Sequence, residues 1–405
     1  RVVAHRAIPP RQGRPNRIGS LNPMPGSSVA RWVYLDHAAS TNMHPAAVEA
    51  MSHYLAEGHA NPSGSHRMSR DSRKVIDEAR DIVASIIGCK PGEIIFTSGG
   101  TEGANAAVLG AVRRHGGRAV CSAAEHHAVL HCVEHVGGTV VAVTAGGTID
   151  TDELERVLAD DPDVSVVSVM AVNNEVGSIT DLAAVSRIVR ARAPRAVLHT
   201  DAVQAACWLD LSQLWPHVDV LTLSAHKFGG PKGVGIMVQR EGTVLEPLIL
   251  GGGQERDRRS GTHNTAGIVG AAVALAVNNN DRTETVRRLA ELRRRLVDGI
   301  TSAVPCATET LRDSVAGMAH LCFEGLESES LLFLLDEQGV CVSAASACAS
   351  GAMEPSHVLA AMGVPRSRMM GSIRFSLGHD TTGEDIDRAV DVTVAAARRL
   401  AASAS

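Results

Sequence analysis

Short runs of apolar, β-branched residues alternate with helical stretches over most of the chain. The runs are Glu93–Thr97, Ala119–Ser122, Thr139–Thr144, Val164–Val172, Ala196–Thr200, Val218–Leu223 and Gly235–Val238. Helical stretches separate several runs; in Ser69–Ile87, apolar residues recur at helical spacing before Gly88. This alternation predicts an α/β fold with a mainly parallel sheet that helices cover. Because ligands bind such sheets at the carboxyl ends of the strands, residues just after each run are site candidates.

The pattern changes on either side of this region. The opening residues are rich in arginine and proline and lack hydrophobic periodicity, so we expect a flexible basic leader over 1–30. A long arginine-rich helix at Arg282–Ile300 leads out of the alternating region, and smaller strand and helix patterns follow it. We therefore expect a large domain over 45–283 and a smaller α+β domain over 31–44 plus 284–405.

Composition excludes several classes of protein. Hydrophobic residues make up 44% of the chain and charged residues 20%, as in ordinary globular proteins. With 39 basic and 44 acidic residues, the net charge of −5 gives no global attraction to nucleic acid or anionic membranes. The longest apolar stretches fall short of the ~20 residues that a bilayer span needs, so no membrane partner is expected. Eight cysteines are too sparse for a disulfide framework and indicate a reducing, cytoplasmic location.

The segment Val218–Gly235 contains the sharpest local feature, an apolar strand that runs into Ser-Ala-His-Lys and a glycine-rich turn. The chain has only four lysines, and Lys227 is the one at the end of this strand. A desolvated lysine has a lowered pKa and forms Schiff bases with carbonyl compounds. The alternative interpretation is an exposed lysine at a strand end.

Two more segments suit a pyridoxal phosphate site, which needs an anion cup and a carboxylate for its pyridine nitrogen. Thr97–Glu102 (TSGGTE) follows a strand and opens a helical stretch, so its glycines, hydroxyls and helix N-terminus could hold a phosphate. Asp201 directly follows the run Ala196–Thr200, and Gln204 lies one helical step further on. The alternatives are a plain strand-to-helix turn and an aspartate that caps a helix.

Histidines and amides follow two further runs. His127 and His131 are spaced as i, i+4 but lack a nearby third ligand, so we predict no metal site. His126 is at least as well suited to stack on a flat cofactor. Asn174, in the motif NNEVG, is either a turn residue or a hydrogen-bonding partner for a ring oxygen and a carboxylate.

Two residues in the C-terminal part complete the set of candidates. Cys348 lies in a run of Ala, Ser and Gly ahead of a Glu-Pro turn, which predicts an exposed, mobile loop; a small core residue is the alternative. Arg374 lies inside a strand-like segment, where an inward arginine suits bidentate binding of a carboxylate. The alternative for Arg374 is a surface arginine on an edge strand.

Taken together, these segments resemble the cysteine desulfurases of the nitrogenase and iron–sulfur-cluster assembly type. Those enzymes are class V aminotransferases, a family of fold-type I pyridoxal phosphate enzymes. The match runs from Tyr34 to about Gly378, and the motifs occur in the family's order. They are SGGTE, EHHAVL, NNEVG, DAVQ, SAHKFGGPKG, GGGQERDRRSGT and SACASGAMEPSHVL.

The resemblance implies pyridoxal phosphate as the cofactor and assigns roles to individual residues. Lys227 would form the covalent link to the cofactor, Asp201 would pair with the pyridine nitrogen, and His126 would stack on the ring. Arg374, with Asn174, would bind the substrate carboxylate. The other cofactor contacts would be Gly100, Thr101, Ser224 and His226 at the phosphate, Gln204 and Asn174 at the ring oxygen, and Thr262 at the phosphate of the neighbouring subunit.

The implied reaction converts L-cysteine to L-alanine. Lys227 and His126 would transfer protons, and the thiolate of Cys348, on a loop of the small domain, would take the sulfur as a persulfide. That loop would deliver sulfur to an acceptor protein for iron–sulfur cluster assembly, tRNA thiolation or DNA phosphorothioation. Thr262 implies a homodimer, and no direct binding of nucleic acid is expected. The alternatives are a selenocysteine lyase or another class V enzyme, and a scaffold that docks sulfur-transfer partners.

Overall fold

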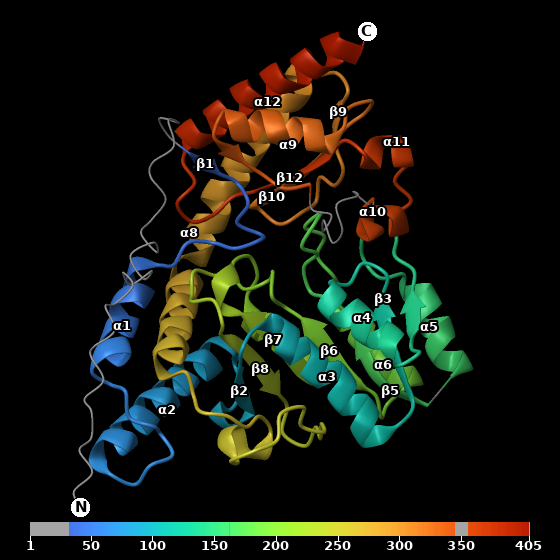
Figure 1. The fold of residues 1–405 in the computed structure, drawn as a ribbon. Helices are drawn as coiled ribbons and strands as arrows, with labels where there is room; N and C mark the ends of the chain where they lie inside the picture. The colour runs from blue at the N-terminus through green and yellow to red at the C-terminus, as the bar shows by residue number, and fades with distance from the viewer. Residues whose placement is uncertain (1–31, 162, 345–354, 405) are drawn as a thin grey trace, which may run out of the picture.

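A seven-stranded sheet forms the centre of the larger part of the molecule (Figure 1). The computed structural model describes residues 32–161, 163–344 and 355–404, so the predicted leader lies outside the described residues. The strands, in sheet order, are β2 (Ile94–Thr97), β8 (Gly235–Gln239), β7 (Val220–Ser224), β6 (Val197–Asp201), β5 (Val164–Ser168), β3 (Arg118–Ser122) and β4 (Thr139–Val141). Only β8 runs antiparallel to its neighbours within these described strands. The prediction of a mainly parallel sheet, with a strand in each predicted run, is confirmed.

Helices cover both faces of this sheet. They are α1 (Pro45–Ala56), α2 (Arg67–Ile87), α3 (Gly100–His115), α4 (His127–His135), α5 (Thr151–Asp160), α6 (Leu182–Arg192) and α7 (Leu211–Leu214). Successive strand residues point to opposite faces, so Ile94 and Phe96 of β2 belong to a core that includes residues of α2 and α6, whereas Ile95 belongs to another core that includes residues of α3 and α4. The predicted stop of α2 at Gly88 is confirmed, because Gly88 has the left-handed φ of 76° typical of a helix end.

A second core surrounds a smaller antiparallel sheet in the order β12-β10-β9. Its strands are β9 (Ala307–Glu309), β10 (Met318–Phe323) and β12 (Ser372–Ser376), and a separate parallel pair joins β1 (Val33–Tyr34) to β11 (Val340–Cys341). The helices of this part are α9 (Ser328–Glu337), α10 (His357–Ala361), α11 (Arg366–Met369) and α12 (Gly383–Ala404). The predicted change to a smaller α+β pattern in the C-terminal region is therefore confirmed.

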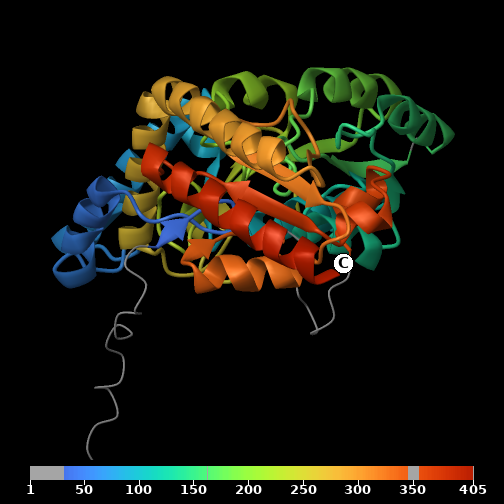
Figure 2. The same cartoon turned by 90° about the horizontal axis from the view of Figure 1, so that it is seen from above.

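One long helix, α8 (Thr265–Ala303), belongs to both cores. Ile268 and Leu275 pack in the core of the large sheet, and Leu289 and Ile300 pack in the second core. Seen from above, α12 lies alongside the C-terminal part of α8 (Figure 2). Because α8 runs unbroken through residue 283, the domain boundaries proposed from the sequence stay a prediction. Among the described residues, no helix has both the length and the apolar character needed to cross a membrane.

Candidate active site

A cavity of about 340 Å³ lies at the carboxyl ends of the strands of the large sheet. Its walls come from the turns after β2, β3, β5, β6 and β7 and, across from them, from β12 of the small sheet. The lining residues are Ala38, Ala39, Gly100, Thr101, His126, Ala128, Met170, Asn174, Asp201, Val203, Gln204, Ser224, His226, Lys227 and Arg374. The cavity therefore brings together every predicted site residue except Thr262 and Cys348.

Lys227 lies in the short turn after β7 and points into this cavity. Its Nζ donates hydrogen bonds to the backbone oxygens of Ala38 and Ala39, over 2.6 and 2.9 Å. Burial, with Arg374 nearby, lowers the pKa of Lys227 to about 8, so a fraction of the amine is neutral at physiological pH. The interpretation of Lys227 as an exposed lysine is therefore wrong.

Asp201 is the last residue of β6 and is buried. Burial raises the pKa of its carboxyl to about 6, although the N–H of Val203, 2.9 Å from Oδ1, and the charge of Lys227 oppose this rise. Asp201 consequently remains mostly ionised at neutral pH. It does not cap a helix, since the residues after it form a turn. The side chain of Gln204, in that turn, donates to the backbone oxygen of Ala38 over 2.8 Å.

The turn from β2 into α3 has the features of a phosphate cup. Gly100 begins the helix, and a Cβ placed on it would lie 2.6 Å from Cγ2 of Val203, so the close approach needs glycine. Free N–H groups at the helix start attract anions, and the hydroxyls of Thr101 and Ser224 line the same cavity. Burial and Lys227 lower the pKa of His226 to about 4, which leaves its imidazole uncharged beside this cup.

His126 is the N-cap of α4, where its Nδ1 accepts the N–H of Ala128 over 3.1 Å. Burial and Lys227 lower the pKa of His126 to about 4. A neutral imidazole held in this way suits stacking on a flat ring. His127 and His131 stack on each other with ring centroids 4.7 Å apart, and the described residues contain no group of three or more metal-ligating side chains arranged to hold an ion.

Arg374 extends from β12 toward the residues of the large sheet. Its Nη1 donates to the backbone oxygen of Asn174 over 2.7 Å, and its Nη2 donates to Oδ1 of Asp36 over 2.8 Å. Although β12 is the edge strand of its sheet, only 6% of the Arg374 side chain is exposed, so the surface interpretation is wrong. Asp36 was not predicted as a site residue; its position two residues after Tyr34, where the resemblance begins, was the available signal.

Two predicted site residues, Thr262 and Cys348, are not among the residues that line this cavity. Thr262 lies exposed on the loop before α8 and does not line the cavity of its own chain. Cys348 lies outside the described residues. On its N-terminal side, Ser343 exchanges backbone hydrogen bonds with Arg374, over 2.7 and 3.2 Å. On its C-terminal side, the hydroxyl of Ser356 donates to the carboxylate of Glu175, next to Asn174.

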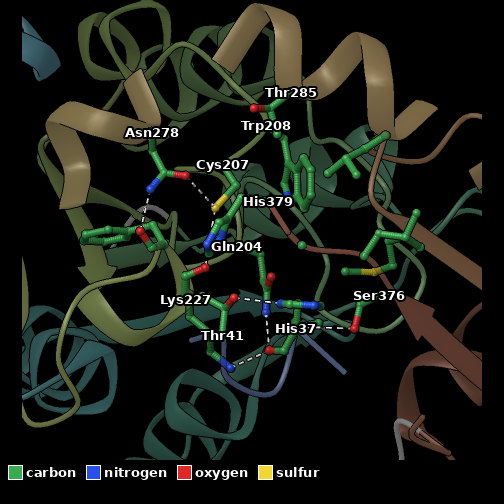
Figure 3. A pocket seen from close by; sticks show the side chains of 16 residues that line it. His37, Thr41, Gln204, Cys207, Trp208, Lys227, Asn278, Thr285, Ser376 and His379 are labelled. Atoms are coloured by element: carbon green, nitrogen blue, oxygen red, sulfur yellow. Dashed lines mark hydrogen bonds between the residues drawn. The ribbon is translucent and has the colours of Figure 1, made fainter. Parts of the chain in front are cut away.

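A second cavity, of about 30 Å³, lies behind Lys227 and has room for roughly one water molecule (Figure 3). The thiol of Cys207 lies there and donates to the backbone oxygen of Lys227 over 3.4 Å. Its Sγ also lies 3.5 Å from Oδ1 of Asn278, on α8. Burial raises the pKa of this thiol to about 12, so Cys207 remains protonated and serves to pack the lysine turn against α8.

Comparisons with known proteins agree with this geometry. The family model described as Aminotransferase class-V matches residues 33–389. An IscS-like cysteine desulfurase from Mycobacterium tuberculosis is 43% identical over 392 residues, which cover 92% of this chain and 98% of the relative. Among solved structures, a NifS-like protein matches with a TM-score of 0.85 and 34% identity, covering 91% of this chain and 100% of that one. The structure of SspA in complex with cysteine matches with a TM-score of 0.73 and 30% identity, covering 85% and 98%. The chain therefore belongs to the aminotransferase class-V family and, within it, to the cysteine desulfurases.

Proposed function

We propose that this cysteine desulfurase converts L-cysteine to L-alanine and transfers the sulfur to Cys348. One observation carries the proposal: Lys227, Asp201 and the N-terminus of α3 surround a single cavity whose far wall contains the buried Arg374. An amine, a carboxylate and an anion cup match the aldehyde, the pyridine nitrogen and the phosphate of pyridoxal phosphate. The solved relative SspA binds cysteine, which supports L-cysteine as the substrate.

The residues of the cavity suit the cofactor in both charge and shape. When bound, pyridoxal phosphate supplies an aldehyde that a lysine amine can join and a ring that accepts electrons from the substrate Cα. Asp201 would keep the ring nitrogen protonated, and His126 would stack on the ring. The remaining contacts would be Gly100, Thr101, Ser224 and His226 at the phosphate, Gln204 and Asn174 at the ring oxygen, and Thr262 of a second subunit at the phosphate.

The chain's own residues would carry out the proton and sulfur transfers. Arg374 binds the substrate carboxylate, which places Cα near Lys227. Lys227, lowered in pKa, takes the Cα proton and later returns one to the product. The thiolate of Cys348 attacks the substrate sulfur. A sulfur–sulfur bond forms, the bond between the substrate sulfur and Cβ breaks, and the electron pair of that bond stays with Cβ. Protonation of that carbon, with His126 as a further proton donor, completes L-alanine and leaves a persulfide.

Contacts on both sides of the Cys348 segment support this role. Ser343 is hydrogen-bonded to the backbone of Arg374, and Ser356 to Glu175, which adjoins Asn174. His357 lies 2.9 Å from the backbone oxygen of Glu125, the residue before His126. The described residues on both sides of this segment therefore lie beside the proposed substrate and cofactor residues.

The proposal includes the partners and setting of the reaction. Thr262 would complete the phosphate site of a second subunit, so the active form is a homodimer. An acceptor protein would take the persulfide sulfur, and we propose a cytoplasmic location because all the described cysteines are free thiols.

The test measures L-alanine formed from L-cysteine in the presence of a thiol reductant, with the wild type and Cys348→Ala. We expect alanine from the wild type and less than about a hundredth of that rate from the variant, as for loss of a nucleophile. Equal rates would remove Cys348 from the reaction and favour another class V activity. No alanine from either protein, despite a bound cofactor, would contradict the assignment of L-cysteine.

A further inference from the structure

Asp36 contacts the guanidinium on which the proposed carboxylate site depends. Its Oδ1 accepts a 2.8 Å hydrogen bond from Nη2 of Arg374. The exposed fractions of the two side chains are 6% for Arg374 and 23% for Asp36. Sheltered from water, this charge-assisted hydrogen bond orients the guanidinium more firmly than a surface ion pair would.

The backbone holds Asp36 in place independently of Arg374. The N–H of Leu35 donates to the oxygen of Cys341, and the N–H of Ser376 donates to the oxygen of Leu35, each over 2.8 Å. Asp36 itself forms a β-bridge with Ser376. On its other side, the N–H of Ala39 donates to the oxygen of Asp36 over 3.0 Å. The backbone that carries this short carboxylate side chain is therefore held in place, and the longer arginine side chain can be oriented against it.

The donors that Arg374 has left restrict how it can bind a carboxylate. Its Nε is buried and, within the described residues, has no hydrogen-bond partner. A ligand therefore cannot reach the N–H of Nε. The second N–H groups of Nη1 and Nη2 remain available to bind one. These two groups bind a carboxylate in bidentate fashion only while the guanidinium plane keeps its orientation.

We propose that Asp36 is a positioning residue for the substrate: it fixes the plane of Arg374 so that the two terminal N–H groups face the carboxylate of an amino acid. This inference rests on the proposed function, in which Arg374 binds that carboxylate. The opposing strand does not supply a competing charge, since burial and Arg374 lower the pKa of His320, the residue paired with Arg374 on β10, to about 3.

The test compares two ligands that share an amine and differ in the carboxylate, L-alanine and ethylamine. Binding of each to the holoenzyme is followed through the change in cofactor absorbance. Asp36→Ala should raise the apparent Kd for L-alanine about tenfold or more, the usual effect of losing a charge-assisted hydrogen bond. The Kd for ethylamine should stay within about twofold. Asp36→Asn keeps an acceptor for Nη2 and should restore most of the affinity for L-alanine.

The inference is overturned if Asp36→Ala weakens both ligands equally or neither of them. Arg374→Ala separates that failure from a failure of the proposed function. If Arg374→Ala keeps the preference for L-alanine over ethylamine, the carboxylate site lies elsewhere and the proposed function fails. If Arg374→Ala loses this preference while Asp36→Ala keeps it, only the role of Asp36 is wrong. Should Asp36→Ala not fold, Asp36→Glu, which shifts the carboxylate by one methylene, should show the same selective loss, and an unchanged preference would overturn the inference.

Discussion

Glu255 allows the contribution of one buried charge to stability to be measured. Its carboxylate accepts hydrogen bonds from Nη1 and Nη2 of Arg80 over 2.9 and 3.0 Å, from the N–H of Phe96 over 3.2 Å, and lies 2.9 Å from Nε2 of His263. Only 1% of the Glu255 side chain is exposed. The same residue begins a turn in which Glu255, Arg256 and Asp257 have φ values of 48°, 58° and 64°. Left-handed backbone is costly for residues other than glycine, so this carboxylate holds a strained turn in place.

The expected loss can be worked from the pKa of Glu255. Burial would raise this pKa, but the hydrogen bonds from His263 and Arg80 outweigh burial and lower it to about 2. A carboxyl whose pKa is ~4.3 in the unfolded chain and about 2 in the folded one contributes roughly 3 kcal/mol at neutral pH. Removing one partner of a buried ion pair costs a similar ~3–5 kcal/mol. We therefore expect Glu255→Gln to lower the free energy of unfolding by about 3 kcal/mol.

Urea unfolding of the holoenzyme, at fixed protein and cofactor concentrations, measures this difference. Because the folded-state pKa is depressed, the contribution of Glu255 is fully present above ~4.3 and is lost as the pH falls toward about 2. Glu241→Gln is the matched control, since Glu241 forms an exposed ion pair with Lys90 and should change stability much less. The reasoning fails if the two variants lose the same stability, or if the deficit of Glu255→Gln is unchanged in acid.

Two further predictions concern the chemistry of the cavity. Asp201→Asn should slow alanine formation at saturating L-cysteine by about 10²–10³-fold, because a fixed charge beside developing charge is lost; a rate within about tenfold of the wild type would remove Asp201 from the reaction. Cofactor rebinding to the apoprotein should accelerate as the pH rises to about 8 and level off above it, since burial lowers the pKa of Lys227 to that value and only the neutral amine reacts with an aldehyde. Stopped-flow absorbance measures this rate, and a profile that is flat across that range would contradict the low pKa.

The residues that follow buried strands could be predicted from the sequence. Lys227 and Asp201 lie directly after apolar runs, and a parallel sheet brings the ends of such runs to one edge. Arg374 could not be decided in the same way, because an arginine on an edge strand is compatible with either face. The structure shows which face Arg374 occupies, because Arg374 pairs with His320, which is buried, and paired residues lie on the same face of a sheet.

Other parts of the site depend on contacts that no local pattern contains. The ion pair between Asp36 and Arg374 joins residues 338 positions apart, and its geometry exists only once the second core has brought their neighbours Leu35 and Phe375 together. The oxygens of Ala38 and Ala39 that receive Lys227 belong to the backbone, which carries no side-chain signal. Glu255 adopts a left-handed backbone conformation, which glutamate disfavours, and a sequence pattern would not predict it. Arg80, from a helix distant in the sequence, forms the ion pair that stabilises it.

The continuity of α8 has a mechanical consequence for the whole molecule. Its 39 residues span roughly 58 Å at 1.5 Å per residue, with one end embedded in each core. Because this one rigid helix packs in both cores, it fixes the distance between the cavity wall that carries Lys227 and the cavity wall that carries Arg374. Helix α8 also joins the two cores into one cooperative unit, because neither core can unfold without unwinding part of the helix that supports the other.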